Sequence, residues 1–343
     1  MIILQCVAAS ISPIVQACRG LDYLRVRVLK VLSPWIKPFI RRRELRVAMF
    51  GSMVVLLALA GTLVFPFWLL ALGPILWGIP HLVSDLRYLV FKPGWQRQQP
   101  FWFLVGVPLV VAGVGYHTMM IGLVATLGAV IVARGQWSRK CAVTLLVAAM
   151  GLAVWLLGDL SQLIFAHLHN FIAVALWWFW RPRTGWCAAA MPALFLMGTL
   201  AILFGWLVPV THLAWLAPAS LPVSGYLETM TAGLAEPWAM RMVLLFAFAQ
   251  AVHYGVWLRL IPEDARAQPT PRPFAATFRM LQQDMGAVVL WVAMILSAGL
   301  AVWAVVDLAE ARAGYLRLAL FHGYLELAAC AILFIQRPTI SAS

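Results

Sequence analysis

The sequence contains few charged residues, few carboxylates and few cysteines, and each scarcity argues against a class of protein. Only 11% of its 343 residues are charged, whereas an ordinary soluble domain has about 25%. There are 12 Asp and Glu residues against 25 Lys and Arg. The five cysteines are scattered without CxxC spacing, so we expect free thiols rather than disulfides or soft-metal ligands. A soluble domain, a disulfide scaffold and a thiolate metal site are therefore all disfavoured.

Hydrophobic residues dominate what is present. They make up 64% of the chain, and the mean hydropathy is +0.91. Segments of roughly 20 apolar residues are long enough to cross the hydrocarbon core as helices. The sequence predicts an all-α polytopic transmembrane helical bundle of about ten spans. The expected spans are 48–70, 73–91, 101–116, 118–133, 141–157, 161–180, 186–208, 241–261, 285–307 and 313–336.

The basic residues lie at the ends of these apolar segments. A net charge of +13 is also typical of nucleic-acid-binding proteins, but this distribution is that of a topology signal, so no nucleic-acid partner is expected. With both termini cytoplasmic, only Arg241, Arg312 and Arg317 fall outside the cytoplasmic side or the span ends next to it. The predicted location is an integral position in a bacterial inner (cytoplasmic) membrane.

We expect two parts along the chain. Residues 1–46 form a basic cytoplasmic segment, and residues 47–343 form a single transmembrane helical domain. Residues 17–40 mix apolar and basic side chains, which favours an amphipathic helix on the anionic leaflet over a flexible basic leader. Residues 209–240 are expected to form a re-entrant or interfacial cap, and residues 262–284 to contain an interfacial helix.

Histidines are concentrated inside the apolar segments. Ionisable groups in hydrocarbon cost roughly 2.5–3.5 kcal/mol each on insertion scales, so a set of them suggests a function. The four spans that carry these histidines run in the same direction, which puts the side chains within roughly 8 Å of one depth. We interpret the set as metal ligands, although a single membrane histidine more often forms an interhelical hydrogen bond. The candidate ligands are His81, His167, His169, His253 and His322.

A carboxylate follows two of these histidines by one helical turn. Asp85 comes four residues after His81, and Glu326 comes four residues after His322, so each pair shares a helix face. Each carboxylate is a candidate ligand or an outer partner that orients a ligand. Tyr88 lies on the same predicted face as Asp85.

Two histidines of the sixth span compete for one position. His167 and His169 are two residues apart and point about 200° away from each other on an unbroken helix. We expect His169 to face the site, while a local distortion would recruit both.

Imidazole and carboxylate ligands without thiolate suit non-haem iron, so Fe(II) is the expected cofactor. Zinc, which would indicate hydrolysis, and haem b, with His81 and His253 as axial ligands, are the alternatives. An apolar setting suits an oxygenase that acts on a lipophilic isoprenoid, carotenoid or other lipid. Catalytic roles are assigned to Asp85 and Glu326, with Tyr88 and Tyr324 near the substrate.

The stretch Gly78-Ile79-Pro80-His81-Leu82-Val83-Ser84-Asp85 resembles the Gly-Leu-Pro-His-Gly-Ala-Leu-Asp motif of the Brp/Blh family. These are membrane β-carotene 15,15'-dioxygenases that hold iron through histidines from several helices. The Pro-His-x-x-x-Asp pattern is retained, the Gly-Ala between His and Asp is missing, and only His81 and Asp85 can be carried over. The resemblance implies an all-helical membrane enzyme with iron.

Two other classes of function fit the same residues. A proton- or ion-coupled transporter would use them as a relay or ion site. A haem-binding or assembly subunit of a membrane complex would present the basic N-terminal segment to a membrane-protein partner. Membrane lipids and a lipophilic small molecule are the other expected partners.

Overall fold

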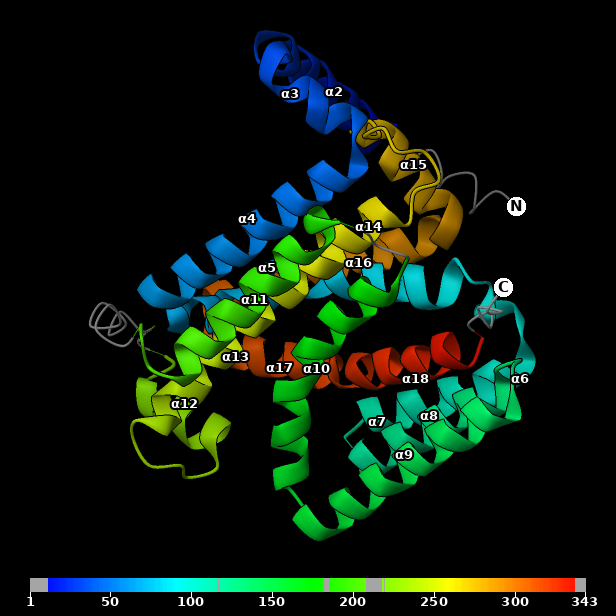
Figure 1. The fold of residues 1–343 in the computed structure, drawn as a ribbon, viewed down its shortest axis with the longest axis vertical. Coiled ribbons are helices and arrows are strands. Elements are labelled where there is room, and N and C mark those ends of the chain that lie inside the picture. The colour runs from blue at the N-terminus through cyan, green and yellow to red at the C-terminus, as the bar shows by residue number, and fades with distance from the viewer. Residues whose placement is uncertain (1–11, 116–117, 182–184, 208–217, 219, 337–343) are drawn as a thin grey trace.

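The computed structural model describes the whole chain except residues 1–11, 116–117, 182–184, 208–217, 219 and 337–343 (Figure 1). Every regular element in the described part is helical, which confirms the all-α fold class. Eight helices are long and apolar enough to cross a membrane, as expected for an integral membrane protein. Their bounds are Arg43–Val64, Pro66–Phe91, Trp137–Leu157, Leu160–Phe179, Trp186–Leu203, Trp238–Asp264, Ala287–Val306 and Leu308–Gln336.

Several of these long helices consist of shorter segments. The bundle's labelled helices include α4 (Arg43–Val64), α5 (Pro66–Asp85), α9 (Trp137–Leu157), α10 (Leu160–Phe179), α11 (Trp186–Leu203), α13 (Trp238–Gly255), α14 (Ile261–Asp264), α16 (Ala287–Val306), α17 (Leu308–Leu318) and α18 (Leu320–Gln336). The π-helical segments η1 (Leu86–Phe91) and η5 (Val256–Leu260) continue α5 and α13.

The third and fourth expected spans form shorter helices. One runs over Gln99–Gly113, through α6 (Gln99–Phe101), η3 (Trp102–Gly106) and α7 (Val107–Gly113). The other is α8, Thr118–Val132, which has 15 residues. Both fall below the roughly 20 residues that cross the hydrocarbon at right angles. Ten crossings and cytoplasmic termini therefore stay predictions.

Burial divides the helices into a centre and a periphery. Within the most apolar stretch of each helix, 78% of the residues of Trp238–Asp264 are buried, but only 11% of those of α9 and of α16. The helix that contains α13 is thus surrounded by protein, packing against α4, α5, α10 and α11. Helix α18 packs against α8 and α10. The polar residues predicted for a site belong to these enclosed helices, whereas the peripheral helices present apolar side chains outward.

Two amphipathic helices and a short basic one cover one end of the bundle. Helices α2 (Ser12–Val31), α3 (Ser33–Arg41) and α15 (Phe274–Met285) lie together at the top of Figure 1. The Asp22 carboxylate accepts the backbone N–H groups of Phe274 and Ala275 at 2.7 and 3.1 Å, which caps the start of α15. Outward apolar residues such as Leu24 and Val31 leave α2 with an exposed apolar face.

The long connection predicted at 209–240 is described only in part. Most of its first half lies outside the described residues, and its second half contains α12, Val223–Thr231. Tyr226 of α12 is buried, and its ring centroid lies 5.3 Å from that of Phe67 in α5. Helix α12 therefore packs on the ends of α5 and α13.

The segments η1 and η5 begin at equivalent places in two central helices. Wider π turns occur often at functional sites because they change the direction of the side chains that follow. Ser84, just before η1, donates its hydroxyl to the Trp257 carbonyl of η5 at 2.6 Å. This bond joins the two irregular segments and satisfies a buried carbonyl group.

Close packing of α8 on η3 can be tested at Gly128. A Cβ added there would overlap the backbone carbonyl of Leu104, which cannot rotate away. We expect Gly128→Ala to lower the free energy of unfolding by about 1–3 kcal/mol, the usual cost of overpacking. Thermal unfolding in one detergent measures the change. Gly299→Ala is the control, because nothing lies within 4 Å of that Cβ. Equal stability of the two variants would contradict the packing.

Candidate metal centre

Four histidines from four different helices meet in the centre of the bundle. They are His81 of α5, His169 of α10, His253 of α13 and His322 of α18. The ring centroids of His81 and His322 are 4.9 Å apart, and those of His81 and His253 are 5.4 Å apart. The His169 ring lies 5.2 Å from the rings of both His253 and His322. We call these four residues the histidine cluster.

His167 points away from the histidine cluster. Its Nδ1 lies 3.1 Å from the Leu163 carbonyl oxygen, and its ring centroid lies 5.0 Å from that of Phe246. Helix α10 is unbroken here, so residues two apart face opposite sides. The distortion that would bring both histidines of α10 to one centre is absent from this described helix.

Two carboxylates, both fully buried, complete the cluster. Asp85 Oδ2 lies 3.8 Å from His81 Nε2, and Glu326 Oε1 lies 3.6 Å from His253 Nε2. Trp257 donates its indole N–H to the same Glu326 oxygen at 2.6 Å. The indole thus holds one carboxylate oxygen in place and leaves the other free.

The ligand atoms are close enough to share one ion. Candidate atoms of His81, His253 and His322 all lie within 4.8 Å of one another. The same holds for a second group, made of Asp85, His322 and Glu326. His322 belongs to both groups, so it stands at the junction of the imidazole and carboxylate sides of the site.

Backbone carbonyls fix two of the imidazoles. The His169 Nδ1 donates to the Ala166 carbonyl at 2.8 Å, and the His322 Nδ1 donates to the Ala319 carbonyl at 2.5 Å. A carbonyl oxygen only accepts, so each Nδ1 carries the hydrogen and each neutral ring keeps a lone pair on Nε2. This is the usual second contact of a metal-binding histidine. Ala319 lies at the break between α17 and α18.

Several buried atoms of the site have no hydrogen-bond partner among the described residues. Buried polar groups are nearly always satisfied, and each exception calls for an explanation. A bound cation would satisfy the carboxylate oxygens, His81 Nε2 and one ring nitrogen of His253, because each of these atoms can offer a lone pair. These atoms are His81 Nε2, Asp85 Oδ1 and Oδ2, both ring nitrogens of His253, and Glu326 Oε2.

The charge of the two carboxylates also favours a bound cation. In the described part of the chain, no lysine or arginine pairs with Asp85 or Glu326. Two carboxylates buried without a positive partner are costly unless protons or a cation neutralise them. Imidazole with carboxylate is a ligand set for iron, zinc or copper rather than for calcium.

Two tyrosines without a predicted site role border the cluster. The Tyr254 ring centroid lies 4.8 Å from that of His81, and the Tyr315 hydroxyl lies 3.3 Å from His81 Nδ1. Both are buried. Their spacing in the sequence could have indicated this position. Tyr254 follows His253 directly, and Tyr315 precedes His322 by two helical turns.

The two tyrosines that were assigned to the site lie elsewhere. Tyr88 lies against Trp180, with ring centroids 6.2 Å apart, because the π segment that begins at Leu86 turns it off the face of Asp85. Tyr324 stacks on Phe165 at 4.9 Å, and Phe165 separates it from His169. Tyr324 is two residues from His322, so it faces the opposite side of α18.

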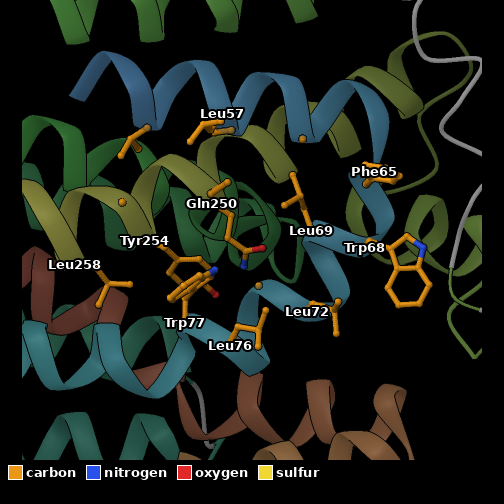
Figure 2. Close-up of a pocket in the computed structure, with 16 residues that line it drawn as sticks. Leu57, Phe65, Trp68, Leu69, Leu72, Leu76, Trp77, Gln250, Tyr254 and Leu258 are labelled. Atoms are coloured by element: carbon orange, nitrogen blue, oxygen red, sulfur yellow. The ribbon is translucent and has the colours of Figure 1, made fainter. Parts of the chain in front are cut away.

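An apolar cavity of about 560 Å³ lies beside the cluster, between α4, α5 and α13. Figure 2 shows Gln250 and Tyr254 among apolar side chains that line it. Leu57 and Leu76 line the cavity and are also 65% and 57% exposed, so the cavity opens on the outer surface of the bundle. Tyr254 separates this space from His81.

Comparison of the chain with models of protein families, with curated proteins and with solved structures gave no match.

The two histidines of α10 provide a matched test of the site. We expect His169→Ala to weaken metal binding by more than the roughly 10–100-fold that loss of an outer partner costs. His167→Ala should leave metal binding unchanged, because that ring faces Phe246. Metal content after equal anaerobic loading with Fe(II) and dialysis measures both. Equal loss in the two variants, or none in either, would rule out this geometry.

Proposed function

We propose that the chain is an integral membrane, metal-dependent oxidoreductase that uses Fe(II) and O2 to oxidise a lipophilic isoprenoid, carotenoid or lipid. One observation carries the proposal: a buried histidine and carboxylate cluster with unpartnered ligand atoms lies beside an apolar cavity that opens outward. The ligands are His81, His253 and His322, with His169 as the fourth imidazole. The carboxylates Asp85 and Glu326 balance the charge of a divalent ion.

The spacing of the four rings favours a single ion over haem. Each ring of the cluster has a neighbour with its centroid 4.9–5.4 Å away. A porphyrin plane between His81 and His253 would collide with the other two imidazoles, which are packed around the same centre. Zinc remains compatible with the ligands, and the nature of the bound metal decides between hydrolysis and oxidation.

Residues of this chain prepare the site for an apolar substrate. When bound, iron supplies open coordination positions at which O2 is activated. The cavity walls keep water away, and Gln250 with Tyr254 offers polar contacts at the end of the cavity that faces the cluster. A dioxygenase reaction balances without an external reductant, because both atoms of O2 enter the product.

The short resemblance to the Brp/Blh family agrees with this proposal. His81 and Asp85, the two positions that can be carried over, both belong to the cluster. We propose a distant relationship on this basis, together with ten crossings, cytoplasmic termini and a place in a bacterial inner membrane. The basic end of the bundle then faces the cytoplasm.

Metal analysis of detergent-purified protein tests the proposal directly. We expect near-stoichiometric iron and an absorption spectrum without a Soret band. A Soret band would replace the proposal with a haem protein, and stoichiometric zinc would replace oxidation with hydrolysis. Absence of any metal, together with pH-dependent ion flux in liposomes, would favour the transporter alternative.

Blocking the apolar cavity should separate substrate access from metal binding. Leu57→Trp fills the cavity, so O2 uptake with β-carotene in micelles should fall by about tenfold or more at unchanged iron content. Leu56→Trp is the control, since Leu56 is an exposed leucine of the same helix that does not line the cavity. If both variants oxidise β-carotene like the parent protein, the substrate enters by another route.

A further inference from the structure

A second cavity, of about 950 Å³, lies under α2, α3 and α15 at the basic end of the bundle. Its walls come from these helices, from α4, η1, η5 and α14, and from the segment that follows α14. Seven cationic side chains line it, but Glu263 is the only carboxylate among the lining residues. We call this cavity the basic pocket.

Glu263 does not balance the arginines around it. Its carboxylate pairs with Arg46 at 2.6 Å and with Arg259 at 2.7 Å, and it also pairs with Arg266. Glu263 is only 1% exposed, so this group is shielded from solvent. Three guanidinium groups around one carboxylate leave an excess of two positive charges in one wall of the pocket.

Other residues of the lining add more unbalanced charge. Arg87 pairs with Asp284 at 2.7 Å. Arg25, Lys92 and Arg272 also line the pocket, and no carboxylate in the described part of the chain pairs with them. Arg25 and Lys92 donate to carbonyl oxygens instead, at 2.9 and 3.2 Å. These two cations therefore have hydrogen-bond acceptors, but the pocket has fewer anions than cations.

Repulsion within this group is reflected at Arg266. Burial, followed in order of effect by the neighbouring cations Arg259, Arg46 and Arg272, lowers the pKa of its guanidinium to about 10. An anion placed among these groups would relieve the repulsion. Guanidinium groups match the oxygens of a phosphate especially well, because two N–H groups of one arginine can contact two oxygens.

The pocket also has an apolar side that leads towards the bundle. Phe39, Phe50 and Leu258 belong to its lining. Leu258 lines the apolar cavity beside the histidine cluster as well, so the two cavities meet at this residue. On α4, Phe50 lines the basic pocket, and Val54, one turn later, lines the apolar cavity. A basic pocket followed by an apolar cavity fits an amphiphile that has an anionic head and an apolar chain.

We propose that the basic pocket binds the phosphate headgroup of a membrane lipid, whose chain leaves past Leu258 towards the apolar cavity. Basic pockets between membrane helices are typical sites for anionic lipid headgroups. The headgroup site does not depend on the identity of the metal or on any reaction at the histidine cluster.

Lipid binding to the detergent-purified full chain tests the proposal. Native mass spectrometry and thermal unfolding are measured with phosphatidic acid, with phosphatidylcholine and with inorganic phosphate. We expect one tightly bound phosphatidic acid and a raised unfolding temperature, and much weaker effects of phosphatidylcholine. Inorganic phosphate as effective as phosphatidic acid would identify a soluble phosphate compound as the ligand and overturn the lipid assignment. No preference among the three would overturn the site itself.

Variants of two of the three unpaired cations locate the headgroup. Lys92→Gln combined with Arg272→Gln should weaken phosphatidic acid binding by about tenfold or more while iron content stays unchanged. Arg279→Gln is the matched control: Arg279 is exposed on α15 and does not line the pocket. Equal weakening by Arg279→Gln would show non-specific attraction and overturn the proposal. Unchanged iron content separates this test from that of the oxidoreductase proposal.

Discussion

Two buried carboxylates lie with two buried and two half-buried imidazoles between four helices, and no lysine or arginine in the described part of the chain pairs with the carboxylates. Glu326 is held by the Trp257 indole, and two of the imidazoles are held by carbonyl groups of their own helices. These contacts orient the three groups, and Glu326 Oε2 has no hydrogen-bond partner among the described residues. Such a centre is stable only when a cation or protons neutralise it, and the rest of the bundle is arranged around that requirement.

The irregular parts of the helices serve this arrangement. Helix α5 passes into a π segment directly after Asp85, and α13 does so three residues after His253. At the break between α17 and α18, the Ala319 carbonyl accepts both the backbone N–H and the Nδ1–H of His322. Regular helices would place the same side chains at other angles, so the backbone irregularities and the polar cluster are two aspects of one feature.

Two neighbouring cavities adjoin the site, and their lining suits a lipid. The apolar cavity reaches the cluster through Tyr254, and the basic pocket meets the apolar cavity at Leu258. A headgroup site at one end and a redox site deeper in the bundle would give a lipophilic molecule both an anchor and a fixed depth. Under the proposed function, this continuity connects membrane attachment with substrate orientation.

Composition and periodicity by themselves determined the all-helical class, the long apolar helices and the gathering of histidines at one depth, because these depend on local hydrophobicity and spacing. They also identified His81, Asp85, His322 and Glu326 as pairs on shared faces. Only the tertiary structure decided that His169 and not His167 joins the cluster and that Tyr254 borders it. It also decided that Tyr88 lines the basic pocket and not the histidine cluster. The reason is that π turns, and the rotation of each helix against its neighbours, set the final direction of a side chain. Sequence spacing gives relative angles on one ideal helix, whereas contact between helices depends on packing across the whole bundle.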